Sequence, residues 1–481
     1  MPINSFLYPA TQVVSGYEVA NSLRFNDGSS DYLNRTQGTP TNADKYTLSV
    51  WVKRCGLTTS DYHYIASFDG GSNPREHIRF NDTTDQLTWY FRDSGGTATS
   101  LTTNRLFRDV SAWYHIVCSY DSTQSTSSNR QKIYINGVQE TSFSSSGYVA
   151  QNTDANLNTN SNNIKIGALG VSSPSAGFFD GYMAEYVFID GQALDPTSFG
   201  EFDEDSGIWK PKNVSGLTFG TNGFYLDFEN SGSLGADVSG NGNNFTVNNL
   251  TAIDQSTDTC TINFATWNPL ASSSQATLSE GNLKAVGNST DDGNVFCNMV
   301  PKSGKWYAEF KITKSNDGIP TVGIRQESSG FRLLNGTSGA VGYYQYEASI
   351  RPDGQRYTNN STASWGDSTF ITGSIIGIAL DCDNGAGYIS VNGTYMNSGD
   401  PTSGGSKTGA FITWTEAQAQ YGGQTFASRI YTTSSGIEAN FGSPSYTISS
   451  GNTDGNGYGN FEYAVPSGYY ALNTKNLAEY G

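Results

Sequence analysis

The chain has 481 residues, more than one hydrophobic core usually supports, so two or three domains are expected. Its 13% aromatic residues and 55 glycines enrich strand formers and turn formers together, which favours an all-β fold and excludes a largely disordered chain. The 27 basic and 44 acidic residues give a net charge of −17, which repels phosphate backbones and argues against nucleic acid as a partner.

The chain begins with a segment that is expected to be extended. Pro2 and Pro9 interrupt any regular element within residues 1–20. This stretch also lacks the basic start and the continuous apolar run of a signal peptide. No later stretch reaches the length of a membrane-spanning helix, so we expect no membrane insertion.

Residues 21–196 are predicted to form a first β-sandwich. In KYTLSVWVK, the residues Tyr46, Leu48 and Val50 occupy every second position, which is the period of a strand with one buried face. Further strands are predicted at Ile78–Phe80, Leu87–Phe91, Trp113–Tyr120, Lys132–Ile135, Ile164–Ile166 and Tyr182–Ile189. A spacing of roughly one strand per dozen residues is typical of a sandwich.

A change in composition separates this region from a second sandwich. Residues 197–275 are rich in Asn, Ser and Gly and are predicted to be a connector. Residues 276–442 return to the strand pattern, with Trp306 and Phe310 on one face of KWYAEFKIT. Further strands are predicted at Thr321–Arg325, Val341–Tyr346, Ser374–Asp381 and Gly387–Val391. Residues 443–481 are interpreted as a C-terminal segment.

The two halves share a local pattern. WYHIVCSYD is followed by KIYINGVQE in the first half, and IIGIALDCD by GYISVNGTYM in the second. In each half, an apolar strand that ends in Asp is followed by a polar turn, a second strand and an Asn-Gly pair. The Asn-Gly pair supplies the positive φ angles of a type I′ hairpin turn. The same three-stranded meander is therefore predicted in both domains, each within a jelly-roll sandwich.

These residues resemble two known domain families. The elements SLRFNDGSSDYL, YTLSVWVKR, WYHIVCSYD, KIYINGVQE and FDGYMAEYVFIDGQALDP resemble laminin G-like domains of the concanavalin A-like lectin and glucanase type. In the second half, GKWYAEFKIT, TVGIR, GYYQY and GSIIGIALDCDNGAGYISVNG are similar to SPRY domains. The resemblance implies an all-β protein of two concanavalin A-like jelly-roll sandwiches, joined by the Gly/Asn/Ser-rich connector.

The order of the parts is more specific than either domain. A laminin G-like domain, then LDFENSGSLGADVSGNGNNFTVNNL, NFATWNPL, a SPRY domain and EYAVPSGYYALNTKNL resembles structural proteins of tailed phages of marine bacteria. That resemblance implies a place on the virion surface after synthesis in the bacterial cytoplasm, other virion proteins as partners, and residues 1–20 as a particle anchor. Since fibres are commonly trimeric, a homo-oligomer is expected.

Three functions follow from this resemblance. The first is a non-enzymatic adhesin, as tail fibre, receptor-binding protein or head fibre, that contacts host-surface polysaccharide. The alternative is a capsid or tail decoration protein without glycan binding. The third is a polysaccharide depolymerase, because some concanavalin A-like folds are glucanases.

The candidate catalytic residues argue against an enzyme. Glycoside hydrolysis needs two carboxylates on opposite sides of a sugar bond, and the nearest candidates, Glu201 and Asp203 in EFDEDSG, lie in a predicted exit segment where a solvated acidic loop is expected. No GxSxG motif is present, and a structural role is expected for His115 in its strand. We therefore predict no catalytic residues. The five cysteines form no CxxC pair, and Cys118 and Cys382, which lie in predicted strands, are expected to be free thiols.

Two kinds of binding residue are predicted. Oxygen-rich loops contain Asp69, Asp82 and Asp121, which are calcium candidates on the laminin G-like resemblance, while ordinary turn formation is the competing interpretation. No other cofactor is expected. Glycan binding uses exposed aromatic side chains that stack on sugar faces, and core packing is the competing interpretation for each one. The candidates are Trp89, Tyr90, Tyr343, Tyr344, Tyr346 and Trp365.

Overall fold

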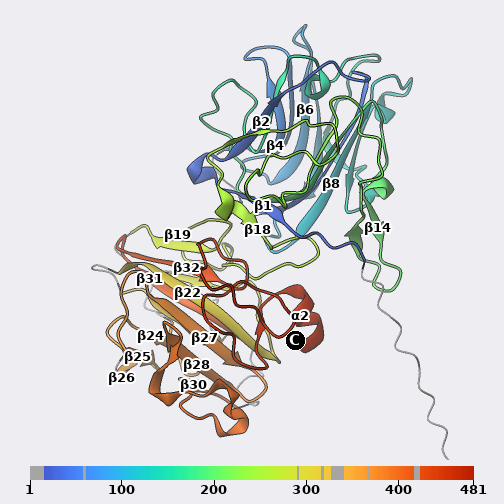
Figure 1. The fold of residues 1–481 in the computed structure, drawn as a ribbon. Coiled ribbons are helices and arrows are strands. Elements are labelled where there is room, and N and C mark those ends of the chain that lie inside the picture. Colours follow the sequence, from blue (N-terminus) through green and yellow to red (C-terminus); the bar gives the residue numbers. More distant parts are fainter. Residues whose placement is uncertain are drawn as a thin grey trace, which may run out of the picture.

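The computed structural model describes residues 16–57, 61–289, 292–315, 319–326, 341–366, 368–415 and 423–481. The fold is almost entirely antiparallel β and consists of two sandwiches that lie side by side (Figure 1). This confirms the predicted fold class. Among the described residues, no helix has the length and apolar character needed to cross a membrane.

The first sandwich contains two eight-stranded sheets. One has the order β10 (Val138–Gln139), β9 (Gln131–Ile135), β8 (Trp113–Asp121), β3 (Lys45–Arg54), β13 (Gly181–Asp190), β1 (Ser22–Phe25) and β18 (Gln255–Ser256), with β16 (Phe224–Leu226) also paired to β13. The other has the order β11 (Phe143–Ser146), β7 (Ala98–Leu106), β6 (Gln86–Arg92), β5 (Arg75–Phe80), β4 (His63–Asp69), β12 (Asn163–Ile166), β2 (Tyr32–Thr36) and β17 (Thr246–Asn248). Their facing side chains form one continuous core, which contains Tyr46, Leu48 and Val50 of β3 as the alternation predicts.

Residues 197–275, expected as a connector, build onto the first sandwich. The short strands β16, β17 and β18 pair with β13, β2 and β1. The hairpin of β14 (Gly200–Phe202) and β15 (Trp209–Pro211) packs Trp209 against the outer face of the first sheet, in a cluster with Trp51 and Trp113. This segment therefore adds strands to both sheets before the chain enters the second sandwich.

The second sandwich has a nine-stranded and a six-stranded sheet. The first has the order β19 (Ala276–Ser279), β20 (Lys284–Gly287), β32 (Ser435–Asn440), β22 (Lys305–Ser315), β27 (Ile375–Asp381), β28 (Ala386–Val391) and β29 (Thr394–Tyr395), with β30 (Ile412–Thr413) on β28 and β33 (Tyr470–Ala471) on β22. The other has the order β21 (Asp292–Phe296), β31 (Gln424–Tyr431), β23 (Thr321–Gln326), β24 (Ala348–Ile350), β25 (Gln355–Thr358) and β26 (Ser361–Ser364). Trp306 and Phe310 of β22 lie in the core between them, as predicted.

Two local features differ from the sequence prediction. Residues 341–346, expected as a strand, form turns over the outer face of the six-stranded sheet, where Ser349 donates a hydrogen bond to the Val341 carbonyl oxygen. The helix α2 (Thr474–Tyr480) begins at Asn473, whose side chain accepts a hydrogen bond from the Asn476 amide. In the described part of the chain, the other helical elements are short 3₁₀ turns: η1 (Asp27–Ser29), η2 (Ser127–Asn129), η3 (Asn156–Asn158), η4 (Pro196–Ser198), η5 (Ala252–Asp254), η7 (Met396–Ser398) and η8 (Pro401–Ser406).

The repeated Asn-Gly meander is present in both sandwiches. Strands β8, β9 and β10 pair in succession, as do β27, β28 and β29. Asn136 and Gly137 have φ angles of 48° and 79°, and Asn392 and Gly393 have 47° and 80°. These positive angles are the ones that a type I′ turn requires, so this prediction is confirmed.

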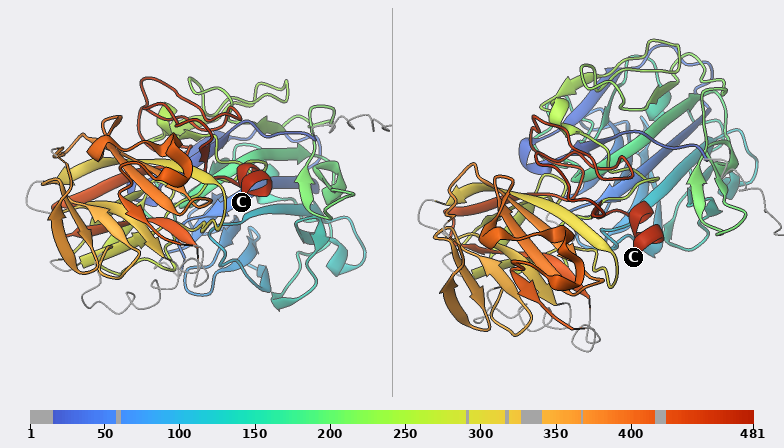
Figure 2. Two further views of the ribbon diagram at one scale, coloured as in Figure 1. Left: turned by 90° about the horizontal axis from the view of Figure 1, so that it is seen from below. Right: turned by 60° about the horizontal axis from the view of Figure 1, so that its bottom comes forward.

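The sandwiches meet along a polar and aromatic junction. The Tyr182 hydroxyl donates to the Gly281 carbonyl oxygen at 3.0 Å, and the Asn282 side chain donates to the Cys55 carbonyl oxygen at 3.2 Å. Figure 2 shows α2 beside this junction, where Lys475 forms an ion pair with Glu18. The first residues that the structure describes therefore also take part in the junction between the two sandwiches.

Candidate functional site

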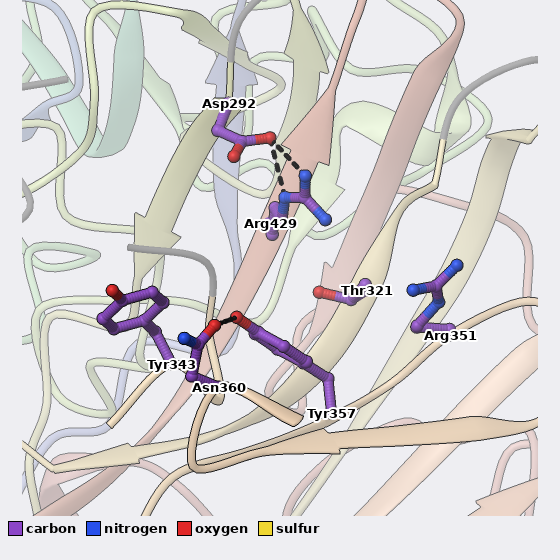
Figure 3. Close-up of a pocket in the computed structure, with 7 residues that line it drawn as sticks. All are labelled: Asp292, Thr321, Tyr343, Arg351, Tyr357, Asn360 and Arg429. Atoms are coloured by element: carbon purple, nitrogen blue, oxygen red, sulfur yellow. Dashed lines mark hydrogen bonds and ion pairs between the residues drawn. The ribbon is translucent and has the colours of Figure 1, made fainter. Parts of the chain in front are cut away.

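A pocket lies on the outer face of the six-stranded sheet in the second sandwich. Its volume is about 320 Å³, at the lower end of the usual range of about 300–1,000 Å³ for small-molecule sites. The lining side chains come from β21, β23, β25, β31 and the adjoining loops (Figure 3): Asp292, Thr321, Tyr343, Arg351, Tyr357, Asn360 and Arg429.

Strand alternation turns these side chains outward. In β23, Val322 and Ile324 enter the core, so Thr321 points to the opposite face. In β31, Ile430 enters the core, and Arg429 lies directly across from Thr321 in the antiparallel ladder. Neighbouring strands therefore place a hydroxyl and a guanidinium side by side on the floor of the pocket.

Both arginines of the pocket form ion pairs. Arg429 donates from Nε and Nη2 to one carboxylate oxygen of Asp292, at 2.7 and 2.6 Å. Arg351 forms an ion pair with Asp353 at 3.3 Å. The described lining residues include two arginines and one aspartate, and Asp353 beside Arg351 balances the second arginine. The pocket thus presents guanidinium N–H donors and a carboxylate, which favours a strongly polar ligand.

Two buried polar atoms at the pocket lack a hydrogen-bond partner among the described residues. They are Thr321 Oγ1 and Arg351 Nε. The Thr321 side chain belongs to a residue that is only 2% exposed. A buried polar group without a partner costs about 1–3 kcal/mol, so such atoms usually meet water or a ligand. Here both belong to side chains that line a cavity.

Tyrosine side chains form the opposite wall. Tyr357 donates a hydrogen bond from its hydroxyl to Asn360 Oδ1 at 2.8 Å, which holds both side chains at the rim (Figure 3). Tyr343 is held by turns whose backbone contacts the sheet, since the Gly342 amide donates to Glu347. The tyrosine rings offer apolar faces beside the charged floor. This combination binds a ligand that has both C–H faces and polar groups.

The aromatic candidates in the second sandwich have different positions. Tyr343 lines the pocket. Tyr344 packs beside it, with ring centroids 5.1 Å apart, and against a small cluster that contains Phe296. Tyr346 packs against the main core, as does Trp365, whose ring lies 4.1 Å from the Arg356 guanidinium. The structure therefore assigns Tyr343 to the pocket and the other three to packing.

Trp89 requires a correction. Its side chain is fully buried in the first core, where Nε1 donates to Glu76 at 3.0 Å, so no sugar can reach it. Tyr90 points to the other face, as strand geometry requires, and is partly exposed. Its ring stacks on His77 at 5.6 Å. Of this pair only Tyr90 is accessible.

The calcium candidates already have protein partners. Asp69 forms an ion pair with Arg75 at 3.1 Å, Asp82 caps the following turn, and Asp121 accepts hydrogen bonds from Thr123. Within the described ranges, no group of three or more His, Cys, Asp or Glu side chains is placed to hold a metal ion. The structure does not bring these three aspartates together as a site.

The candidate catalytic side chains also have partners within the protein. Glu201 and Asp203 lie on the β14–β15 hairpin, where both carboxylates contact the Lys210 ammonium, at 3.6 and 3.1 Å. His115 is buried under the same hairpin, with hydrogen bonds to Ser49 and Trp209. The cysteines are free thiols, as expected for Cys118 and Cys382.

Most of the pocket was not predicted from the sequence. Arg429 follows Ser428 and precedes Ile430 in SRIY, so alternation alone places an arginine on the non-core face of a strand. The same reasoning applies to Thr321 in TVGIR. The neighbours that complete the pocket come from other strands, and no local signal indicates which strands are adjacent.

One family model matches much of the first sandwich. Residues 27–197 match a sequence family described as the concanavalin A-like lectin/glucanases superfamily, in its laminin G-like form. The first sandwich is therefore a concanavalin A-like, laminin G-like domain. No curated protein matches the chain.

Several solved structures are similar to parts of the chain. The SPRY domain of human HERC1 has 15% identity over 36% of this chain and 96% of its own, with a TM-score of 0.27. A heptameric SAP-like pentraxin from Limulus polyphemus has 14% identity over 37% of this chain and 80% of its own, with a TM-score of 0.28. Domain 4 of the extracellular arabinanase AbnA from Geobacillus stearothermophilus, solved with arabinotriose, has 19% identity over 34% of this chain and 68% of its own, with a TM-score of 0.25.

Proposed function

We propose that the chain is a non-enzymatic carbohydrate-binding protein and that the pocket of the second sandwich is a saccharide site. The observation that carries this proposal is a cavity walled by Tyr343 and Tyr357 and lined by Thr321 and Arg351, each of which has a buried polar atom without a partner among the described residues, Thr321 Oγ1 and Arg351 Nε. Sugar hydroxyls satisfy such atoms, and the C–H face of a pyranose packs on a tyrosine ring. The concanavalin A-like first domain supports the same class of ligand.

The charged side chains of the pocket indicate which class of saccharide it binds. Arg351 and Arg429 both line the pocket, and guanidinium groups bind carboxylates through paired N–H donors. The preferred saccharide is therefore one that carries a carboxylate, such as a uronic acid. A short saccharide fits the volume of about 320 Å³.

Replacing Thr321 with valine is expected to weaken saccharide binding without loss of stability. The exchange keeps the shape of the side chain but removes a buried hydroxyl that has no partner among the described residues.

Arg351→Ala should weaken binding of uronate-bearing glycans about tenfold or more, which corresponds to about 1.4 kcal/mol. A glycan array followed by calorimetry with the full chain provides the measurement.

The matched control is Arg105→Ala, because Arg105 is a partly exposed, ion-paired arginine of the first sandwich. That variant should bind as the unmodified protein does. Equal affinity of Thr321→Val, Arg351→Ala and the control would contradict the pocket assignment, and so would a chain that binds no glycan at all.

The biological setting we propose is the surface of a phage particle, where the chain acts as an adhesin. Support comes from the resemblance in domain order to structural proteins of marine phages and from the acidic net charge of −17, which suits an exposed surface. In this proposal the sandwiches face the host polysaccharide, other virion proteins hold residues 1–20, and the chain forms a homo-oligomer.

An antibody to this chain is expected to label mature phage particles in electron micrographs. Free soluble glycan that binds the pocket should lower adsorption of those particles to host cells. Labelled particles whose adsorption is unaffected would favour a decoration protein, and unlabelled particles would contradict the virion role. Sugar release from host polysaccharide that Glu201→Gln with Asp203→Asn abolishes would instead identify a depolymerase.

A further inference from the structure

A buried lysine and a buried aspartate meet a partly exposed asparagine at the junction of the two sandwiches. Lys53 Nζ lies 2.7 Å from Asn263 Oδ1 and 2.7 Å from Asp258 Oδ2. The Lys53 side chain is 0% exposed and that of Asp258 is 2% exposed. Lys53 lies near the end of β3, on the face opposite the core, whereas Asp258 and Asn263 lie on the segment that leads into the second sandwich.

The surroundings orient all three polar groups. The Asn263 amide donates from Nδ2 to the Ser111 carbonyl oxygen at 2.6 Å, which turns Oδ1 toward Lys53. Trp113 donates from Nε1 to the other carboxylate oxygen of Asp258 at 3.2 Å. The Tyr182 ring lies 5.5 Å from Nζ. Aromatic side chains thus shield the group from water while hydrogen bonds fix its geometry.

These distances put the amine near the amide carbon. Since a C=O bond is about 1.23 Å long, Lys53 Nζ lies no more than about 3.9 Å from Asn263 Cγ. Reacting atoms in favourable arrangements lie about 3–3.5 Å apart, so a small rotation of either side chain completes the approach. Burial raises the pKa of the Asp258 carboxyl, which allows it to hold a proton beside the amine.

We propose that Lys53 and Asn263 form an intramolecular isopeptide bond, with Asp258 as the group that transfers protons. Asp258 takes a proton from the Lys53 ammonium, and the lone pair on Nζ then forms a bond to Asn263 Cγ. The C=O electron pair moves to Oδ1 and returns as the Cγ–Nδ2 bond breaks, while Nδ2 receives the proton that Asp258 carries and leaves as ammonia. Asp258 then takes the second proton that Nζ must lose, and the departing ammonia accepts that proton and becomes an ammonium ion. An ammonium and a carboxamide thereby become a secondary amide and an ammonium ion, so atoms and charge balance without any oxidant or other reagent.

The bond would join the two sandwiches covalently. Asn263 is followed by Phe264 and Ala265, whose backbones pair with residues of the C-terminal segment, including Leu472. A link from β3 to this segment therefore ties the core of the first sandwich to the start of the second. Such a link also restricts the unfolded chain, because it closes a loop between residues 210 positions apart. This inference does not depend on the proposed saccharide site.

Mass spectrometry of the intact, purified chain tests the proposal. The protein should be about 17 Da lighter than its sequence, the mass of one ammonia. After trypsin digestion, the peptide that contains Lys53 should remain joined to the peptide that contains Asn263, without cleavage after Lys53. Folded protein of full mass would overturn the proposal and leave an ordinary buried ion pair.

The position of the mass loss matters, because an Asn-Gly pair such as Asn136-Gly137 can lose the same mass by closing to a succinimide. A loss confined to one peptide therefore also contradicts the proposal. Asn263→Ala and Asp258→Asn should both restore the full mass. Asn298→Ala is the matched control, since Asn298 also contacts Ser111, and that variant should keep both the lower mass and the joined peptides.

Discussion

Replacing Glu76 with alanine is expected to lower the free energy of unfolding of the first sandwich by about 4 kcal/mol. The Glu76 carboxylate is fully buried and accepts three hydrogen bonds: from the Tyr46 hydroxyl at 2.6 Å, Trp89 Nε1 at 3.0 Å and the Leu157 amide at 2.9 Å. Its removal leaves three buried donors without this acceptor, and each such group costs about 1–3 kcal/mol. Denaturant unfolding followed by tryptophan fluorescence measures the change.

Two further variants show whether the carboxylate itself is responsible. Glu76→Gln keeps the volume but puts an N–H₂ group where an acceptor oxygen stood, so an intermediate loss of stability is expected. Glu201→Ala removes a glutamate from the exposed β14–β15 hairpin and should change stability by less than about 0.5 kcal/mol. If Glu76→Ala were as stable as Glu201→Ala, the role assigned to Glu76 would be wrong.

Acidification from pH 7 to pH 4.5 is expected to destabilise the first sandwich by about 3 kcal/mol through His115 alone. Trp209 Nε1 can only donate, and it lies 2.9 Å from His115 Nδ1, so Nδ1 is an acceptor. The ring proton therefore resides on Nε2, which faces Ser49 Oγ at 2.8 Å. A protonated imidazole would turn a second N–H toward Trp209 and break this arrangement.

The direction of this pH dependence follows from the pKa of His115 in the folded protein. Burial lowers the pKa of His115 from its ordinary value of 6.5 to about 3, so the folded protein binds fewer protons than the unfolded chain. Stability from this group is complete above pH 6.5 and is lost as the pH falls toward 3. The His115→Phe variant should lack this part of the pH dependence. Unfolding curves at the two pH values, compared with those of the unmodified chain, measure it.

His63 must be considered in the same experiment, because burial also lowers its pKa to about 3. The His63→Phe variant should remove a separate share of the pH dependence, and the double variant should remove both. A His115→Phe variant that loses as much stability between pH 7 and pH 4.5 as the unmodified chain would contradict the neutral, hydrogen-bonded state of His115.

The positions of the strands could be predicted from local sequence. In β3 and β22, apolar residues at every second position identify both the strand and its buried face. The Asn-Gly turns at Asn136 and Asn392 were predictable for a similar reason, since few residue pairs adopt two successive positive φ angles. Both signals depend only on residues a few positions apart.

The partners of individual aromatic residues could not be predicted in this way. Alternation places Leu87, Trp89 and Phe91 on one face of β6, and this apolar face is the core, so the burial of Trp89 was predictable. Its polar partner was not, because Glu76, whose carboxylate accepts a hydrogen bond from the Trp89 indole, belongs to the neighbouring strand. Similarly, β16, β17 and β18 have only two or three residues each, and their partners lie far away in the sequence.

The sequence by itself determined the class of protein: an all-β chain of two sandwiches with duplicated meanders and an acidic balance of charge. Only the tertiary structure decided which polar side chains meet. Thr321, Arg351 and Tyr357 share a pocket because β23, β24 and β25 are neighbours in the sheet, and Lys53 meets Asn263 because a distant segment crosses β3. Strand periodicity is a property of adjacent residues, whereas a site requires the order in which strands pair across the whole chain.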